Sequence, residues 1–321
     1  MEICYLTLKQ MLTMFFLILV GFILRKKSVL PKDADTVLAK LETCVFIPAV
    51  LMFNQMTQCT VETFKTDYTL IMYGGIIITA AILMAYPLSK LFVRKINTPG
   101  DAYLRDIYKY ALTFGNFGLM GNFIILGVWG NEVFYKYSLF TFFPAILSSS
   151  WGLYVLVPKD KNAGILENLK KGFINPPVIG LVAGMLIGLL GIGKYIPDFA
   201  LKAIENAGSC QGPIAMLLAG FVIGGFDFKQ LLTNKKVYAA TLLRLIIIPA
   251  ILMLIMKLLG MSDETMTLAL ITFATPLGMN TIVFPAAYGG DTKPGAAMAM
   301  ISHVAAVATI PLMYLIFIVL L

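Results

Sequence analysis

Three glycines and two asparagines interrupt an apolar segment in the first half of the chain. The segment runs from Thr113 to Asn122 and contains Gly115, Asn116, Gly118, Gly121 and Asn122. Glycine costs a helix about 1 kcal/mol relative to alanine, so a helix here is expected to break. Inside a membrane, such a break leaves N–H groups on one half-helix and carbonyls on the other, which together suit an ion or a carboxylate. The alternative is close helix packing through the small residues Gly118 and Gly121.

A second segment of the same character lies in the other half of the chain. Thr272–Asp291 aligns with Thr113–Glu132 at a constant offset, and both begin with Thr-Phe. The second copy contains a helix-breaking proline, Pro276, with the polar residues Thr275 and Asn280 close by. Two interrupted hydrophobic segments at corresponding positions of two halves are typical of the binding site of a secondary transporter.

The composition places these segments in a membrane. Hydrophobic residues make up 59% of the 321 residues, only 13% are charged, and the mean hydropathy is +0.85. These values exclude a soluble domain and predict an all-α membrane protein. With about 20 apolar residues needed to cross the bilayer, we expect ten spans, near Leu6–Leu24, Leu38–Met56, Leu70–Val93, Tyr110–Leu126, Tyr137–Val157, Phe173–Ile192, Ile204–Gly225, Val237–Leu259, Met266–Tyr288 and Gly295–Leu320.

The positive charges predict the orientation of these spans. Most of the 25 lysines and arginines lie in the loops after odd-numbered spans, which the positive-inside rule places in the cytoplasm. Both termini are then extracytoplasmic, in a multi-pass protein of the cell membrane. The net charge of +8 is thus a topology signal, and no nucleic-acid partner is needed to explain it.

Five spans in each half require the second half to insert upside down relative to the first. We therefore expect two inverted five-helix repeats, residues 1–157 and 173–321, joined by a cytoplasmic linker at 158–172. The broken fourth and ninth spans should lie in contact. Residues related by an inverted duplication surround a pseudo-two-fold axis in the membrane plane.

Few ionisable groups fall inside the predicted spans. Arg244 is expected to extend its side chain to the cytoplasmic surface, and Glu42 to lie at the interface. His303, the single histidine, either makes a structural bond as a neutral imidazole or takes up a proton as an anion binds. Asn54 and Gln211 are explained equally well by interhelical hydrogen bonds and by substrate contacts.

No zinc, haem, phosphate-loop or catalytic-triad spacing is present in the sequence, so nothing indicates an enzyme. We expect no cofactor. A coupling ion, H⁺ or Na⁺, remains open.

These motifs resemble the auxin efflux carrier family of secondary transporters, which includes bacterial malonate- and malate-type carriers. The likeness covers nearly the whole chain. It is carried by Gly115-Asn116-Phe-Gly118-Leu-Met-Gly121, Phe173-Ile-Asn175-Pro176-Pro177, Gly212-Pro213, Arg244-Leu-Ile-Ile-Ile-Pro249, Ala274-Thr-Pro276-Leu-Gly-Met-Asn280 and Tyr288-Gly-Gly-Asp291. The chain departs from the family pattern at Asn122, where members commonly have proline, and at His303, where a threonine is expected. Asp67 matches the acid of an acid–lysine pair found in plant members, but Ile71 replaces the lysine.

The resemblance implies a scaffold domain from spans one, two, six and seven and a transport domain from the others, with a homodimer formed through the scaffold. An elevator-like movement would carry a small organic anion, a mono- or dicarboxylate, whose carboxylate binds where spans four and nine cross. The candidate substrate-binding residues are Asn116, Gly115, Gly118, Gly121, Asn122, Thr275, Pro276, Asn280, Gln211 and Asn54, and the candidate coupling residues are His303 and Asp67. The alternative functions are a passive anion channel and a membrane sensor that binds a ligand without moving it.

Overall fold

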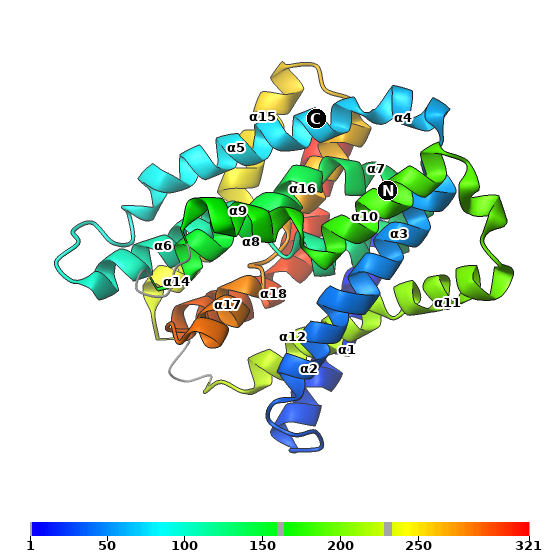
Figure 1. The fold of residues 1–321 in the computed structure, drawn as a ribbon. Coiled ribbons are helices and arrows are strands. Elements are labelled where there is room, and N and C mark those ends of the chain that lie inside the picture. Colours follow the sequence, from blue (N-terminus) through cyan, green and yellow to red (C-terminus); the bar gives the residue numbers. More distant parts are fainter. Residues whose placement is uncertain (1, 159–163, 228–232, 321) are drawn as a thin grey trace.

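A bundle of helices forms the protein in the computed structural model, which describes residues 2–158, 164–227 and 233–320 (Figure 1). The first half contains α1 (Glu2–Lys26), α2 (Ala34–Leu41), the π-turn η1 (Glu42–Phe46), α3 (Ile47–Gln58), α4 (Val61–Asp67), α5 (Thr69–Ser89), α6 (Pro99–Thr113), the π-turn η2 (Phe117–Gly121), α7 (Asn122–Phe140) and α8 (Phe142–Leu156). The second half contains α9 (Ile165–Phe173), α10 (Pro176–Leu189), the short 3₁₀ helix η4 (Ile192–Tyr195), α11 (Asp198–Ser209), α12 (Gln211–Gly224), α14 (Lys235–Leu242), the π-turn η5 (Leu243–Ile247), α15 (Ile248–Leu258), α16 (Asp263–Ala274), α17 (Asn280–Tyr288), α18 (Lys293–Tyr314) and η6 (Leu315–Leu320).

Seven helices in the described residues are long and apolar enough to cross a membrane, or eight if the bent pair α9–α10 counts as one span. The fold is therefore helical and membrane-spanning, as predicted, but the count of ten spans is not confirmed. Two expected spans fall outside this count. The expected fifth span is α8, which has only 15 residues, and the expected ninth span is divided into α16 and α17 by its break.

A break falls inside the interval expected between the fourth and fifth spans, but no long loop is present. Residues 117–140 are helical on both sides of this break, so that α7 consists of two helices that meet there. Gly130 kinks this segment, with φ 77° and ψ −165°, a conformation that only glycine adopts readily. The linker expected at 158–172 lies partly outside the described residues, and its described end forms α9.

Two helix pairs make the most extensive contacts in the molecule, α1 with α12 and α3 with α10. Glycines allow the backbones to approach closely. A Cβ atom on Gly220 of α12 would lie 1.8 Å from the carbonyl oxygen of Ile18, and one on Gly184 of α10 would lie 2.5 Å from that of Met52. This small-residue packing is how helices associate in lipid, where the surrounding tails are as apolar as leucine.

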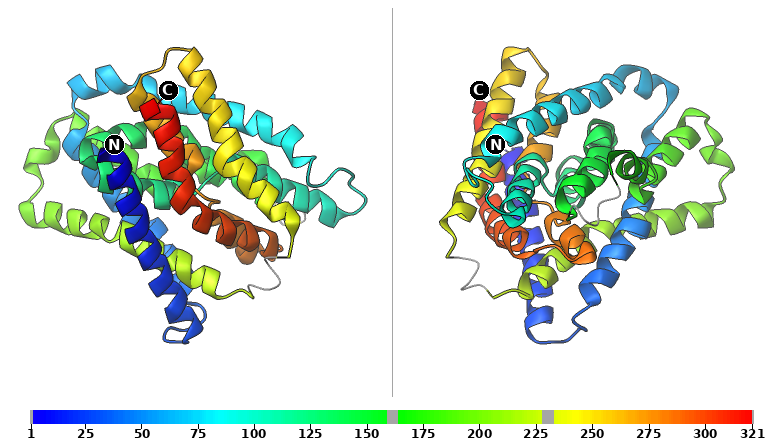
Figure 2. Two further views of the ribbon diagram at one scale, coloured as in Figure 1. Left: turned by 180° about the vertical axis from the view of Figure 1, so that it is seen from behind. Right: turned by 60° about the vertical axis from the view of Figure 1, so that its left-hand side comes forward.

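Both termini lie at the same end of the molecule, away from the connection between α1 and α2 (Figures 1 and 2). That connection carries Arg25 and Lys26 in the last turn of α1. A chain whose two ends lie on the same side of a membrane must cross that membrane an even number of times. Which side of the membrane holds the termini remains a prediction from the positive-inside rule.

Prolines explain two of the π-turns. Pro48 and Pro249 each stand at the second residue after a π-turn, η1 and η5. Proline lacks an N–H group and its ring clashes with the carbonyl four residues earlier. A π-turn relieves the clash by shifting the preceding hydrogen bonds to the carbonyl five residues back, as in Ile47 N–H to Glu42 O and Ile248 N–H to Leu243 O.

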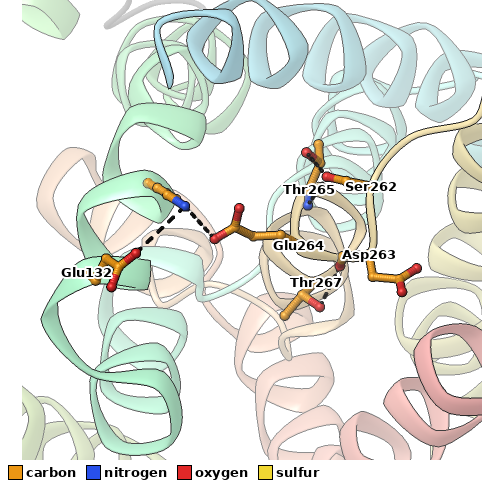
Figure 3. A network of polar contacts seen from close by, with 7 residues as sticks. Glu132, Ser262, Asp263, Glu264, Thr265 and Thr267 are labelled. Atoms are coloured by element: carbon orange, nitrogen blue, oxygen red, sulfur yellow. Dashed lines mark hydrogen bonds and ion pairs between the residues drawn. The ribbon is translucent and has the colours of Figure 1, made fainter. Parts of the chain in front are cut away.

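A charged network holds α7 against the beginning of α16 (Figure 3). Lys136 Nζ on α7 lies 2.7 Å from Glu264 Oε1 and 4.0 Å from Glu132 Oε1. Ser262 caps α16 by accepting a hydrogen bond from Thr265 N–H at 3.2 Å. Because Glu264 is half exposed, the ion pair contributes at most about 1 kcal/mol, and it serves mainly to fix the position of the two helices.

Replacement of Gly220 by alanine should destabilise the protein by about 1–3 kcal/mol, because the added methyl group collides with the backbone of α1, which cannot move locally. The matched control is Gly193→Ala, where the nearest atom would lie at 3.8 Å, an ordinary contact. Thermal unfolding in detergent measures both. Equal midpoints for the two variants would contradict the packing described here.

Candidate functional site: the crossing of two broken helices

The two helix breaks meet inside the protein. The first lies between α6 and η2, where Phe114 is extended, and the second between α16 and α17. Gly115 and Leu277 form an antiparallel bridge, and Asn116 N–H donates to the carbonyl of Pro276 at 2.7 Å. The prediction that the two breaks lie in contact is confirmed.

The first break is shorter than the glycine spacing predicts. Helical hydrogen bonding resumes at Met120, whose N–H donates to Asn116 O, so Gly118 and Gly121 are helical. Gly115 alone lies in the interruption. It is required there, because a Cβ atom would lie 2.2 Å from Arg244 Nη2 and 2.4 Å from Thr275 Oγ1.

The last helix, α18, supports the crossing from behind. Ser302 Oγ accepts a hydrogen bond from Leu277 N–H at 3.0 Å. The next residue, His303, contacts Asn116, with Nε2 3.3 Å from the amide nitrogen. Its Nδ1 lies 2.7 Å from the carbonyl of Ala299, which can only accept, so Nδ1 carries the proton. In the neutral ring Nε2 then accepts from Asn116, which makes the structural bond to a neighbouring helix that one interpretation of His303 expects.

Arg244 does not reach the surface, which corrects the expectation from the sequence. The residue is 2% exposed, and its Nη1 donates to the carbonyl of Thr113 at 3.4 Å. Nε and Nη2 have no hydrogen-bond partner in the described part of the chain. The side chain is held inside because it begins at the π-turn η5, whose neighbours are α6, α16 and α18. No ion pair to a carboxylate is present for Arg244 among the described residues.

A cavity of about 570 Å³ opens beside the crossing. One wall consists of the crossing itself, including Gly115, Asn116 and Asn280. The rest of the lining comes mainly from η1, α3, α8, α10 and α12, and α9 adds the exposed residues Lys170 and Lys171. The cavity is mainly apolar, with polar groups at a few places, which is the usual character of a small-molecule site.

The sequence predicted part of this lining. Five of the candidate substrate-binding residues line the cavity, namely Gly115, Asn116, Gly118, Asn122 and Asn280. Thr275 and Pro276 form the second break without lining the cavity, and Gly121 packs against the hydroxyl of Tyr137.

Four further candidates lie away from the cavity. Asn54 donates to the carbonyl of Asn131 at 2.9 Å, and Gln211 donates to that of Leu119 at 3.3 Å, so both make interhelical bonds. Asp67 is the last residue of α4 and does not line the cavity. His303 lies behind Asn116 and does not line the cavity.

Glu42 is the residue of the site that the sequence interpretation missed. It was expected at the interface, yet it is 1% exposed to solvent and lines the cavity. The signal was present in the spacing, since Glu42 shares one helical face with Ala39 and Thr43, and Ile47 continues that face. Neither carboxyl oxygen of Glu42 has a hydrogen-bond partner in the described residues.

The arrangement suits an anion better than a metal ion. The first N–H groups of a helix have no intrahelical acceptor, and the helical segment that begins at Phe117 starts at the cavity. At α17, Thr281 and Ile282 N–H donate to Gly278 O and Met279 O, so the helical turn opens at Gly278, Met279 and Asn280, which line the cavity. The charge of Arg244 stands directly behind Gly115. No group of three or more His, Cys, Asp or Glu side chains that could hold a metal ion occurs among the described residues.

Comparisons with known proteins identify the family of the chain. A family model described as "Membrane transport protein" matches residues 6–314, nearly the whole chain. An uncharacterized transporter of Methanocaldococcus jannaschii is 22% identical over 293 residues, which cover 88% of this chain and 89% of that relative.

Two glycine variants test the geometry of the crossing. Gly115→Ala should destabilise the protein by about 1–3 kcal/mol, because the methyl group meets Arg244 and Thr275 with no room to relax. Gly118→Ala should leave stability unchanged or slightly raised, because no atom lies within 4 Å of its Cβ position. Thermal unfolding of the two purified variants measures the difference. A Gly118→Ala protein as unstable as Gly115→Ala would show that the first break is placed incorrectly.

Proposed function

Because the chain belongs to the auxin efflux carrier family of membrane transport proteins, we propose that it is a secondary transporter for a small organic anion, whose carboxylate binds at the helix crossing. One observation carries the proposal above the others. The two broken helices meet at the wall of a cavity large enough for such a molecule, about 570 Å³. Discontinuous helices of this kind provide the substrate site in other secondary transporters.

The chemistry of the wall favours a carboxylate. Backbone N–H groups at the starts of two helices and the amides of Asn116 and Asn280 supply hydrogen-bond donors. Arg244 adds a buried positive charge with two donor atoms that have no hydrogen-bond partner among the described residues. A buried cation without a counter-ion is costly, and an anion in the cavity would offset that cost. The exposed lysines Lys170 and Lys171 would attract an anion to the cavity.

The helix pairs support an inverted duplication. The first span packs on the seventh as α1 on α12, and the second packs on the sixth as α3 on α10, which is the exchange that a two-fold axis generates. Two glycines with positive φ also occupy corresponding positions of the two halves. Gly130 and Gly289, which align at the offset of the two broken segments, both have positive φ, 77° and 72°.

An elevator-like movement would separate α1, α2, α3, α10 and α12 from the other spans. Side-chain amides make several of the contacts across this boundary, with Gln10 donating to Phe123 O at 2.9 Å and Gln211 to Leu119 O. Neutral hydrogen bonds contribute only about 0.5–1.5 kcal/mol each, so they can break and re-form as the domains slide. A second cavity, of about 410 Å³, lies across the same boundary and shares no lining residue with the first. This second cavity is lined in part by α7, and it would give α7 room to move relative to α12.

Asn116→Ala should weaken carboxylate binding by about 1–3 kcal/mol, because a charged group loses a donor. Counterflow in proteoliposomes measures the consequence for transport. Labelled and unlabelled carboxylates should exchange through the wild-type protein and exchange much more slowly through the variant. The control is Asn54→Ala, which lies away from the cavity. Wild-type exchange by a folded Asn116→Ala protein would refute the assignment of Asn116. The same assay on the wild-type protein distinguishes the alternative functions, because a channel would collapse the carboxylate gradient and a sensor would neither exchange the carboxylate nor collapse its gradient.

A disulfide across the boundary tests the sliding movement. In the double variant Gly212→Cys, Phe123→Cys, made without the native cysteines, the two Cβ atoms should come within disulfide range, because a Cβ on Gly212 would lie 3.2 Å from Phe123 Cγ. Oxidation should stop counterflow and leave carboxylate binding intact, and reduction should restore exchange. Full exchange by the oxidised protein would exclude movement of α7 relative to α12.

A further inference from the structure

We propose that Glu42 is a proton-binding group of the cavity and must be protonated before the anion binds, so that each anion is carried together with one proton. The inference rests on the proposed function and adds the identity of the coupling ion. Three features of the structure support it: the burial of Glu42, the absence of a hydrogen-bond partner for its carboxyl group among the described residues, and its place in the same cavity as the crossing.

The carboxyl group of Glu42 lies in a place where a charge is not compensated. The residue is 1% exposed, and both oxygens are buried with no hydrogen-bond partner in the described residues. Transfer of an isolated carboxylate into such surroundings costs several kcal/mol, whereas the neutral acid costs much less. The π-turn η1 begins at this residue, and Pro48 fixes that turn, so the side chain stays directed into the cavity.

The elements packed against η1 offer no cation that would hold Glu42 in its charged form. The titratable groups on η1 and on the helices around it are few, and α3, α10 and α12 contain no Asp, Glu, Lys, Arg or His. The others are Asp35 and Lys40 on α2, Cys44 on η1, and Asp198, Lys202 and Glu205 on α11. Lys202 already pairs with Glu205 at 2.7 Å. Lys40 is exposed, and no ion pair joins it to Glu42 in the described residues. Across the cavity stand Glu167, Lys170 and Lys171 of α9, all exposed, and no ion pair joins any of them to Glu42.

A proton fits this position better than a hard metal cation. Calcium and magnesium take six or more oxygen ligands in proteins. Glu42 is a single carboxyl group, and no cluster of three or more His, Cys, Asp or Glu side chains surrounds it in the described part of the chain. A proton needs one oxygen and no further ligand.

Anion binding and protonation are then linked through charge. A substrate carboxylate at the crossing and an ionised Glu42 would share one cavity of low polarity and repel each other. The anion therefore binds the protonated form more tightly, and by reciprocity it strengthens the binding of the proton. If one proton enters with each anion, the apparent dissociation constant rises by up to tenfold per pH unit once Glu42 ionises in the empty protein.

Infrared spectroscopy tests protonation without any substrate. The purified wild-type protein near neutral pH should show the C=O stretching band of a protonated carboxylic acid, and Glu42→Gln should lose that band. The matched control is Glu167→Gln, which also lines the cavity but is exposed, and it should retain the band. A wild-type spectrum in which no such band depends on Glu42 would overturn the inference.

Binding measured against pH tests the coupling. Calorimetry with a simple mono- or dicarboxylate between about pH 5.5 and 8.5, above the pKa of an ordinary carboxylic acid, should show affinity falling as pH rises in wild type. Glu42→Gln, which mimics the protonated acid, should keep tight binding and a flat profile. His303→Gln and Glu167→Gln should follow the wild-type profile.

The outcomes separate the two proposals. Carboxylate binding with the same pH dependence in Glu42→Gln as in wild type would overturn the inference about Glu42 and leave the proposed function standing. A pH profile flattened by His303→Gln and unaffected by Glu42→Gln would assign the proton to the histidine and would also overturn it. A wild-type protein that binds and exchanges no carboxylate at any pH would instead remove the proposed function, and the coupling with it.

Discussion

The requirement that every buried backbone group find a partner determines the centre of this protein. Helices broken inside a membrane lose hydrogen bonds that lipid cannot replace. Here each break supplies hydrogen-bond partners for the other. Asn116 N–H donates to Pro276 O, beside the bridge between Gly115 and Leu277. Ser302 on α18 completes the set by accepting from Leu277 N–H. Neither break would be stable alone, so the two halves of the chain depend on each other.

The crossing also determines where charge can lie. Gly115 has no side chain, and this allows Arg244 to approach the backbone from behind while the front faces the cavity. Glu42 lines the same cavity. Both ionisable residues belong to π-turns that precede a proline, η5 and η1, and such turns often mark functional sites in helices. The proposed anion and its proton would therefore bind in a cavity that contains one buried acid and has one buried cation behind Gly115.

Much of this could be predicted from the sequence, because the relevant signals are local. Pro276 and Gly115 interrupt apolar stretches, and the repeat places the interruptions together. Tertiary position was harder to predict. Arg244 and Glu42 lie within a few turns of loops, and distance along a helix does not reveal that neighbouring helices cover them. The interruption after Leu126 was expected as a loop, because Asn131 and Glu132 resemble a loop in composition, but the structure confines it to a kink at Gly130.

The most direct test of the central claim is chemical labelling at the crossing. Gly118→Cys, in a protein whose Cys4, Cys44, Cys59 and Cys210 are serine, places a thiol in open space on the cavity wall. The rate of its reaction with a membrane-impermeant maleimide is measured with and without a saturating carboxylate. The account predicts that the carboxylate slows labelling at least several-fold. Labelling at an unchanged rate while the same protein exchanges that carboxylate would show that the anion passes elsewhere.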